Sequence, residues 1–428
     1  MSARRSGRTA VTLFSGGHGG ASIARDLLRT PGIDLTLVIN GYDNGRSTGA
    51  LRRYLPGMLG PSDFRKNLLI HLDDRDPRQA ALSSILERRL AAGTTREELG
   101  ELAAAIGGRT GHAVIGAPAG EGRAGHPAFA ALPPRARTAI LRDLTALVRR
   151  LDSHPDGLDL TDCALGNLVF AGAYLRLGGD FNAAVRACAR TFASPARLVN
   201  VTNGENAFLV ALKQDGRLLA DEADIVAPQD TAVITDLFLL REPVTPARQA
   251  ELEARSAEEV RRILASHRAT VSPNPEALDA ILDADLILYG PGTPHSSLLP
   301  SYLTPGVADA IAESRATAKV FVVNTRDDHD VQGLSAPELV DRTLAYLGDP
   351  YNERDTVTHV LCHRAARATA APKAPRVPSG VVDGGVRAGA QWVIADLEDP
   401  ERPGVHCGPR TVRALTEIAG EGALERAR

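Results

Sequence analysis

The stretch VTLFSGGHGGASIARDLL, residues 11–28, constrains the fold of this chain more than any other part of the sequence. An apolar, β-branched run ends in a glycine-rich turn, and a helical pattern of apolar residues follows over residues 21–30. A second apolar run, IDLTLVIN, occupies residues 33–40. A strand, a helix and a strand at this spacing form a βαβ unit. The start of the chain therefore predicts an α/β fold.

Later apolar runs extend this prediction. The runs ADLILYGPG (284–292) and AKVFVVN (318–324) have the character of buried strands, and a loop and a helical pattern follow each of them. Strands that alternate with helices form a parallel sheet. We therefore expect a Rossmann-like, mostly parallel sheet with helices on both faces. The segments PARLVNVT (195–202) and AFLVALKQDGRLLADEADIV (207–226) predict strands of a smaller β-rich region.

Changes of pattern along the chain predict four segments. Residues 1–77 form the first part of the Rossmann-like nucleotide-binding domain, and residues 78–152 form a helical insertion with a Gly/Pro-rich link near 116–126. Residues 153–367 complete the α/β domain and include the small β-rich region. Residues 368–428 contain an Ala/Pro-rich exposed loop, a last strand and a closing helix.

Composition excludes several classes of function. The 49 basic residues are balanced by 52 acidic ones, so the net charge of −3 provides no overall basic field for nucleic acid or an anionic membrane. The apolar run near the start is too short for a signal peptide or a membrane span. The four cysteines are widely separated, which argues against a disulfide framework and a structural zinc site. We therefore expect a cytoplasmic protein that binds neither nucleic acid nor membrane.

The glycine-rich turn is suited to a phosphate group. Its glycines let the main chain approach a ligand without Cβ clashes, and the helix behind them directs N–H groups and the positive end of its dipole at that ligand. These glycines are Gly16, Gly17, Gly19 and Gly20. The spacing matches neither the dinucleotide motif G-x-G-x-x-G nor a P-loop with its lysine. A tight turn without a ligand stays the alternative, and His18 is either a substrate contact or a turn residue.

Polar residues follow the second predicted strand, in the segment DNGRSTGALRR that begins at Asp43. Ligands of open α/β sheets bind beyond the carboxyl ends of the strands, so we expect Asp43 at the same crevice as the glycine turn. Asn44, Ser47 and Thr48 add polar side chains, and Arg46 adds a charge that can pair with phosphate oxygens. The alternative is a solvated turn with an N-capped helix.

A second acidic residue occurs in GPSDFRKNL, just before a predicted helix. Mg²⁺ in phosphate sites is bound by one or two carboxylates together with phosphate oxygens, so we predict Mg²⁺ as the cofactor, with Asp43 and Asp63 as ligands. Arg65 supplies a cation beside Asp63. Asp63 as a helix N-cap is the alternative. Asn167 opens an apolar helix at GNL and either offers its amide to a ligand or caps that helix.

Two later strands also end in polar loops. GPGTPHSS begins at Gly290, and VFVVN ends at Asn324. Several loops of this kind at one edge of a parallel sheet surround one crevice. The candidate ligand-binding residues in these loops are Gly290, Gly292, Thr293, His295, Ser296 and Asn324.

The order of these motifs resembles the family that joins 2-phospho-L-lactate transferase with the bacterial gluconeogenesis factors. Its motifs are similar to SGGHGG, DNGRSTGALR, GPSDFRKNL, GNL, GPGTPHSS and TPG of this chain, in the same order. The resemblance covers about residues 9–347. The second half of the chain is closer to the gluconeogenesis-factor branch.

This resemblance implies an activity as well as a fold. The transferases pass a phosphate-linked group from a guanosine diphosphate-activated donor to a deazaflavin hydroxyl with Mg²⁺, whereas the gluconeogenesis factors are thought to bind UDP-sugars. We therefore expect a Mg²⁺-dependent transferase that acts on a GDP- or UDP-linked small molecule, with Asp43, Asp63 and Arg65 as its catalytic residues. The alternative is a nucleotide-binding regulator without turnover. The oligomeric state is open, with a homodimer as one option.

The chain also departs from the family pattern after Asp43. Asn44 stands where family members commonly have a second Asp, and Arg46 replaces a glycine. These differences, with the longer helical insertion at 78–152, concern the acceptor half of the site more than the donor half. A nicotinamide oxidoreductase is a third alternative, for which Asp43 could contact a ribose, but the motif order argues against it.

Overall fold

The computed structural model describes residues 8–108, 127–154, 157–228, 232–326, 329–331, 333–364, 386–387 and 389–420. The Gly/Pro-rich link near 116–126 and the Ala/Pro-rich loop at 368–380 lie outside these ranges. The chain divides into two compact units, one formed by residues 1–43 with 195–428 and the other by residues 44–194.

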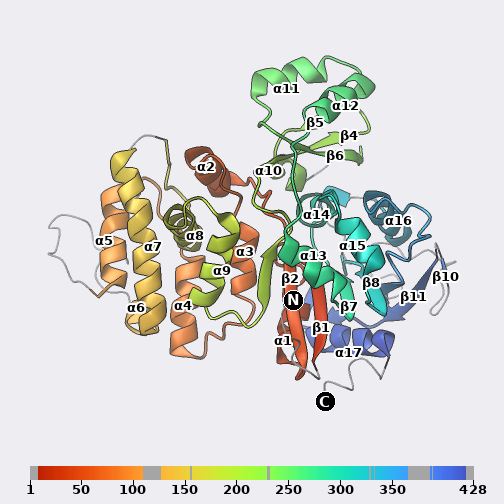
Figure 1. Ribbon diagram of the computed structural model, residues 1–428, viewed down its shortest axis with the longest axis horizontal. Helices are drawn as coiled ribbons and strands as arrows, with labels where there is room; N and C mark the ends of the chain where they lie inside the picture. The colour runs from red at the N-terminus through yellow and green to blue at the C-terminus, as the bar shows by residue number, and fades with distance from the viewer. Residues whose placement is uncertain are drawn as a thin grey trace. The chain divides into compact units, whose positions relative to one another are not determined.

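An eight-stranded sheet forms the centre of the first unit within the described residues (Figure 1). Its strand order is β10-β11-β9-β8-β7-β1-β2-β3, and every neighbouring pair except β10 with β11 is parallel. The strands are β1 Thr9–Phe14, β2 Ile33–Ile39, β3 Arg197–Asn200, β7 Leu286–Tyr289, β8 Ala318–Val322, β9 His359–His363, β10 Val386–Arg387 and β11 Ala390–Ala395. The predicted Rossmann-like, mostly parallel sheet is confirmed.

Helices cover both faces of this sheet because it grows in two directions from its centre. The steps from β1 to β2 and from β7 to β8 run in opposite directions, and right-handed crossovers then place α1 and α15 on opposite faces. Helix α1 packs against α17, and α13 packs against α15 (Figure 1). The helices of this unit are α1 Ala21–Arg29, α10 Glu222–Val226, α11 Pro246–Glu253, α12 Ala257–Ser266, α13 Pro275–Leu282, α14 Leu299–Tyr302, α15 Val307–Glu313, α16 Ala336–Tyr346 and α17 Gly408–Ala419.

Strand β3 corrects one expectation. The sequence places residues 195–202 in the smaller β-rich region, but β3 pairs in parallel with β2, from Thr36 with Arg197 to Ile39 with Asn200. A strand of four residues has too short a pattern to show which sheet it joins. Its pairing is decided by the outer edge of β2, whose backbone groups need partners.

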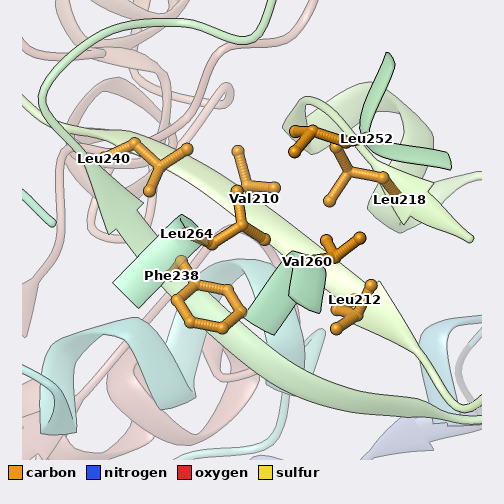
Figure 2. Packing of buried hydrophobic residues seen from close by; sticks show 8 residues of the cluster. All are labelled: Val210, Leu212, Leu218, Phe238, Leu240, Leu252, Val260 and Leu264. Carbon is orange, nitrogen blue, oxygen red and sulfur yellow. The ribbon is translucent and has the colours of Figure 1, made fainter. Parts of the chain in front are cut away.

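The predicted smaller β-rich region forms a three-stranded antiparallel sheet with a core of its own. The strand order is β5-β4-β6, with bounds Leu218–Leu219, Phe208–Lys213 and Ile234–Leu240. We call these three strands the small sheet. Figure 2 shows the buried apolar side chains that meet between its strands and α11 and α12, namely Val210, Leu212, Leu218, Phe238, Leu240, Leu252, Val260 and Leu264. The small sheet is therefore stabilised by apolar contacts separate from those of the large sheet.

The second unit is helical and is inserted in the chain between β2 and β3. Its helices are α2 Arg46–Tyr54, α3 Ser62–Leu68, α4 Pro77–Glu87, α5 Arg96–Ile106, α6 Pro127–Ala130, α7 Pro134–Ser153, α8 Leu165–Arg176 and α9 Phe181–Thr191. The helical unit therefore begins earlier and ends later than the insertion expected at 78–152. In the described part of the chain, no helix has the length and apolar character needed to cross a membrane.

His406 attaches a β-hairpin, β12 (Glu398–Asp399) with β13 (Arg402–His406), to the end of β8. Its ring is buried, and its Nε2 donates to the carbonyl oxygen of Val323 at 3.2 Å. Burial lowers the pKa of His406 from the ordinary 6.5 to about 4. The unfolded chain therefore binds a proton at this ring below about pH 6.5, whereas the folded chain does so only near pH 4.

We expect stability to be lost at His406 as the pH falls from about 6.5 to about 4, by at most about 3 kcal/mol. The variant His406→Gln keeps an amide that can donate to Val323 but has no group that titrates. Urea denaturation at about pH 7.5 and about pH 4.5 measures the effect, and the variant should lose less stability than the wild type between these pH values. Equal losses in both proteins would show that another group controls this pH dependence.

Candidate functional site

The two glycine-rich loops follow the central strands of the large sheet. Strand β1 lies between β2 and β7. The strands β2 and β3 continue the sheet on one side of β1, and the strands from β7 onward continue it on the other side. Open α/β sheets bind ligands at such a switch point, beyond the carboxyl ends of the strands. Gly16–Gly20, which we call the first turn, follows β1. Gly290–Ser297, which we call the second loop, follows β7.

The first turn and the second loop, which follow neighbouring parallel strands, are in direct contact. A Cβ atom on Gly19 would lie 2.5 Å from the carbonyl oxygen of Pro291 and 2.7 Å from the Cα of Gly292. A Cβ atom on Gly16 would overlap the side chain of Ser297. These two positions are glycine because the two loops pass each other without room for a side chain.

Main-chain donors accumulate where the first turn enters α1. Among the described residues, the N–H groups of Gly20, Ser22 and Ile23 have no hydrogen-bond acceptor. Gly20 is the N-cap residue and has no side chain to satisfy them. The Oγ of Ser22 is buried and also has no partner. Within the first turn, Gly17 is half-buried and His18 is exposed. These donors and the positive end of α1 form a surface suited to an anion.

Most main-chain donors of the second loop, in contrast, are used inside the protein. The N–H of Gly290 donates to the carbonyl oxygen of Phe14 at 3.1 Å. The N–H of Gly292 donates to Asn324 Oδ1 at 3.0 Å, and Asn324 Nδ2 donates to the carbonyl oxygen of Gly292 at 3.1 Å. The amide of Asn324 therefore holds the second loop in place, and this loop acts as a wall beside the first turn.

His295 lies fully buried, and its ring contacts protein groups on both sides. Its Nδ1 lies 3.1 Å from Asp330 Oδ2, and its Nε2 lies 3.1 Å from a guanidinium nitrogen of Arg342. The sequence predicts a ligand contact here, but the ring is enclosed by the fold. Of the neighbouring predicted residues, Thr293 is half-buried and Ser296 is buried.

Asn40 is a site residue that sequence reasoning missed. It is buried where β2 ends, its Nδ2 donates to the carbonyl oxygen of Ser297 at 2.7 Å, and its Oδ1 accepts from the N–H of Tyr42 at 3.2 Å. Asn40 therefore joins the end of β2 to the second loop. An amide side chain at the carboxyl end of a buried strand is the signal that could have identified it. Asp43 follows as the last residue before the helical unit and is half-buried.

In the helical unit, residues from three predicted motifs form one buried network. Asn167 Nδ2 donates to Ser62 Oγ at 3.1 Å and to Thr48 Oγ1 at 3.5 Å, and the two hydroxyl oxygens lie 2.6 Å apart. Arg65 Nε donates to Asn167 Oδ1 at 3.1 Å, and its terminal nitrogen donates to the carbonyl oxygen of Leu86 at 3.1 Å. The network fixes the orientation of the Asn167 amide and of both hydroxyls.

The residues of this network lie inside helices and do not cap them. Asn167 is inside α8, whose N-cap is Ala164, so the capping alternative for Asn167 is wrong. Thr48 is inside α2, whose N-cap is Gly45. Ser62, which the sequence did not single out, lies beside Asp63 and belongs to the network. Of the other predicted residues, Asn44 and Ser47 are half-buried, and the side chain of Arg46 lies outside the described part of the structure.

Asp63 lies in the first turn of α3, and its Oδ1 accepts from Lys66 Nζ at 2.8 Å. The N-cap of α3 is Pro61, so the capping alternative for Asp63 is wrong. The ammonium group of Lys66 competes with any metal for this carboxylate oxygen. In the described residues, no group of three or more His, Cys, Asp or Glu side chains is placed to hold a metal. A Mg²⁺ ion in a phosphate site needs only one or two carboxylates, so Asp43 and Asp63 stay the predicted ligands.

Three of the four cysteines are buried thiols that are poorly suited to act as nucleophiles. Cys163, Cys188 and Cys362 are buried, and no cysteine is in a disulfide. Burial raises the pKa of Cys163 to about 11 and that of Cys362 to about 12. These three buried thiols therefore stay protonated near neutral pH.

The sequence of this chain matches one family of known proteins. The sequence model of the family described as 2-phospho-L-lactate transferase CofD matches residues 11–406. The gluconeogenesis factor of Bacillus subtilis is 30% identical over 188 residues, which are 44% of this chain and 49% of that protein. The putative gluconeogenesis factor of Thermotoga maritima is 24% identical over 314 residues, which are 73% of this chain and 67% of that protein. The match to the Bacillus subtilis relative thus spans about half of its length.

Solved structures share the fold. Two crystal structures of one protein from Bacillus halodurans, described as a member of the UPF0052 family, have TM-scores of 0.63 and 0.62 with this chain. Each covers 95% of this chain and 99% of that protein at 19% identity. The likeness therefore extends over nearly the whole α/β architecture.

Proposed function

Because this chain belongs to the 2-phospho-L-lactate transferase CofD family, we propose that it binds a nucleoside diphosphate-linked small molecule, with the diphosphate on the first turn. One observation carries this proposal. The N–H groups of Gly20, Ser22 and Ile23 have no acceptor among the described residues, and they lie at the positive end of α1. A diphosphate supplies oxygens that can accept hydrogen bonds from these N–H groups, and its negative charge is stabilised by the positive end of the helix dipole.

We further propose that the bound ligand is the donor of a transferase reaction. The hydroxyl oxygen of an acceptor would form a bond to the phosphorus of the transferred group and lose its proton to solvent. The bond from that phosphorus to the bridging oxygen would break, and this oxygen would leave as part of the nucleoside monophosphate. The N–H groups of the first turn would stabilise the charge that develops on the leaving phosphate. The second loop, held by Asn324 and Asn40, would keep water and the ligand in defined positions beside the turn.

When bound, Mg²⁺ would neutralise part of the negative charge of the diphosphate. From their motifs, Asp43 and Asp63 are the carboxylates proposed to hold it. Arg65 donates to Asn167 and Leu86, so we assign it the task of orienting the Asn167 amide rather than contact with the reacting group.

A second candidate function is binding without turnover, since the relatives from Bacillus subtilis and Thermotoga maritima are named gluconeogenesis factors, a name that specifies no transferase reaction. The observation that favours it is the small number of carboxylates available to bind Mg²⁺. This chain has Asn44 where the motif resemblance implies a second Asp, and Asp63 Oδ1 is in an ion pair with Lys66 Nζ at 2.8 Å. In this case the ligand is a UDP-sugar that is bound and released unchanged.

Calorimetry with GDP, UDP and a UDP-sugar, each with and without Mg²⁺, tests both candidates. We expect saturable binding of one of these ligands. Incubation of the bound donor with alcohol acceptors, followed by detection of nucleoside monophosphate, then separates them. Release of the monophosphate supports the transferase, and binding without release supports the regulator. Absence of binding for every nucleotide would contradict both.

The metal proposal makes opposite predictions for two neighbouring residues. Asp63→Asn replaces a carboxylate by a poorer ligand for a hard cation and should lower the apparent Mg²⁺ affinity by about tenfold or more. Lys66→Met removes the competing ammonium group and should leave that affinity unchanged or raise it. Titrating Mg²⁺ into the nucleotide complex measures both effects, with thermal unfolding as the control. If both variants respond alike, the carboxylate serves only its ion pair with Lys66.

A further inference from the structure

We propose that His295 is a positioning residue that holds the second loop against the first turn and makes this hold depend on the small sheet. The inference rests on the proposed function, since it concerns how firmly the ligand surface is kept in shape. His295 is 0% exposed, and its ring lies between the charged groups of Asp330 and Arg342.

The partners of the ring determine where its proton lies. Arg342 donates and cannot accept, so the Nε2 of His295 is the acceptor in their 3.1 Å contact. The ring proton is therefore on Nδ1, and it is donated to Asp330 Oδ2 at 3.1 Å. The same carboxylate oxygen accepts from the main-chain N–H of His295 at 2.7 Å. One oxygen of Asp330 thus fixes both the backbone and the ring of His295.

This fixed residue controls the wall beside the first turn. His295 belongs to the short helical turn Pro294–Leu298, which also contains Ser297. The side chain of Ser297 occupies the space next to Gly16. The main-chain carbonyl oxygen of Ser297 accepts from Asn40 Nδ2 at 2.7 Å. A displacement of His295 would therefore move Ser297 and change the space available at the first turn.

The opposite side of the ring leads to the small sheet. The guanidinium of Arg342, on α16, donates to the carbonyl oxygen of Ile234 at the start of β6 as well as to His295. The small sheet packs on its own apolar core, so a displacement of this sheet would move its strands together. Such a shift would reach His295 through Arg342 and then the second loop.

Two amide variants test the two sides of the ring separately. His295→Asn keeps a donor near the position of Nδ1 and loses the acceptor for Arg342, whereas His295→Gln keeps a polar group near Nε2 and loses the donor to Asp330. We expect each to weaken binding of the nucleoside diphosphate that the wild type binds by about tenfold. Asp330→Asn keeps an oxygen that can accept both bonds, so it should retain affinity within about twofold. Wild-type affinity in both His295 variants would overturn the proposal.

A second measurement does not require a ligand. Hydrogen exchange of peptides that cover residues 16–20 should be faster in His295→Gln than in the wild type, because the wall beside these residues is loosened. Unchanged exchange would count against the positioning role even if nucleotide binding is lost for other reasons. In the wild type, ¹⁵N spectra of the histidine rings, assigned by the signal missing in the variant, should show His295 protonated at Nδ1. Protonation at Nε2 would refute the arrangement. If the wild type binds no nucleotide, the proposed function fails while these two measurements still decide this inference.

Discussion

Replacing Gly19 by alanine is expected to weaken nucleotide binding by about tenfold or more, and replacing it by valine is expected to abolish binding. The reason is steric. A Cβ atom at Gly19 would lie 2.5 Å from the carbonyl oxygen of Pro291, which belongs to the main chain and cannot rotate away. The first turn and the second loop would have to separate, and the donors of the turn would no longer converge on one anion. Calorimetry with the bound nucleotide measures the loss.

Gly20 offers a matched control one residue away. A Cβ atom there would have its nearest neighbours at 3.9 Å, and the backbone of Gly20, with φ of −88°, is accessible to alanine. Gly20→Ala makes the same chemical change, keeps the N–H group and should retain affinity within about twofold. Circular dichroism should show an intact fold in both variants, and the thermal unfolding of Gly20→Ala should match that of the wild type. Equal affinities of Gly19→Ala and Gly20→Ala would show that contact between the two loops is not needed for binding.

Gly172→Ala is expected to lower the stability of the helical unit by about 3 kcal/mol or more. Helices α7 and α8 approach so closely at this point that a Cβ atom on Gly172 would overlap the carbonyl oxygen of Asp143. Separation of the helices would also disturb Asp143, which is fully buried and accepts from Arg176 Nε at 2.6 Å. Calorimetry of the full chain should show the transition of this unit lowered by about 6–12 °C.

The control for this prediction is Gly100, in the interior of α5. The nearest atom to a Cβ on Gly100 would be a methyl carbon of Val148 at 3.9 Å, an ordinary packing distance. Because alanine favours a helix over glycine, Gly100→Ala should raise stability by about 0.5–1 kcal/mol. The same substitution in two helices of one unit thus has opposite expected signs. A transition of Gly172→Ala within about 1 °C of the wild type would mean that α7 and α8 can move apart at little cost.

The sequence predicts the centre of the fold well because that part depends on local patterns. The first turn lies between two β-branched runs, and the continuous apolar runs at β7 and β8 are typical of parallel strands. The contact between the first turn and the second loop follows from one rule, that the carboxyl ends of parallel strands share an edge. Strand β3 is different, since its four residues are assigned to a sheet by a neighbouring edge and not by their own pattern.

The roles of single polar residues could not be predicted because they depend on distant partners. Asp330, 35 residues beyond His295, converts an expected ligand contact into a buried support. Asn167 meets Ser62 across a separation of 105 residues, and Arg65 meets Asn167 across 102, so no local motif reveals that Arg65 supports another side chain. Residue types at a motif indicate which chemistry is present, whereas the fold decides which groups face a ligand and which hold those groups in place.

The position of β1 at the centre of the sheet has a consequence for synthesis of the chain. Ala10, at the start of β1, donates its N–H to Asp285 Oδ2, and these residues are 275 positions apart. At a translation rate of about 5–20 residues per second, β7 is made about 15–55 seconds after β1. During this time one edge of β1 has no partner strand, and the first turn has no second loop beside it. The proposed ligand surface is therefore encoded at the start of the chain but completed only after about two thirds of it has been made. Until then β2 can pair with one edge of β1, and the edge that β7 will occupy is an unpaired strand edge of the kind that promotes aggregation.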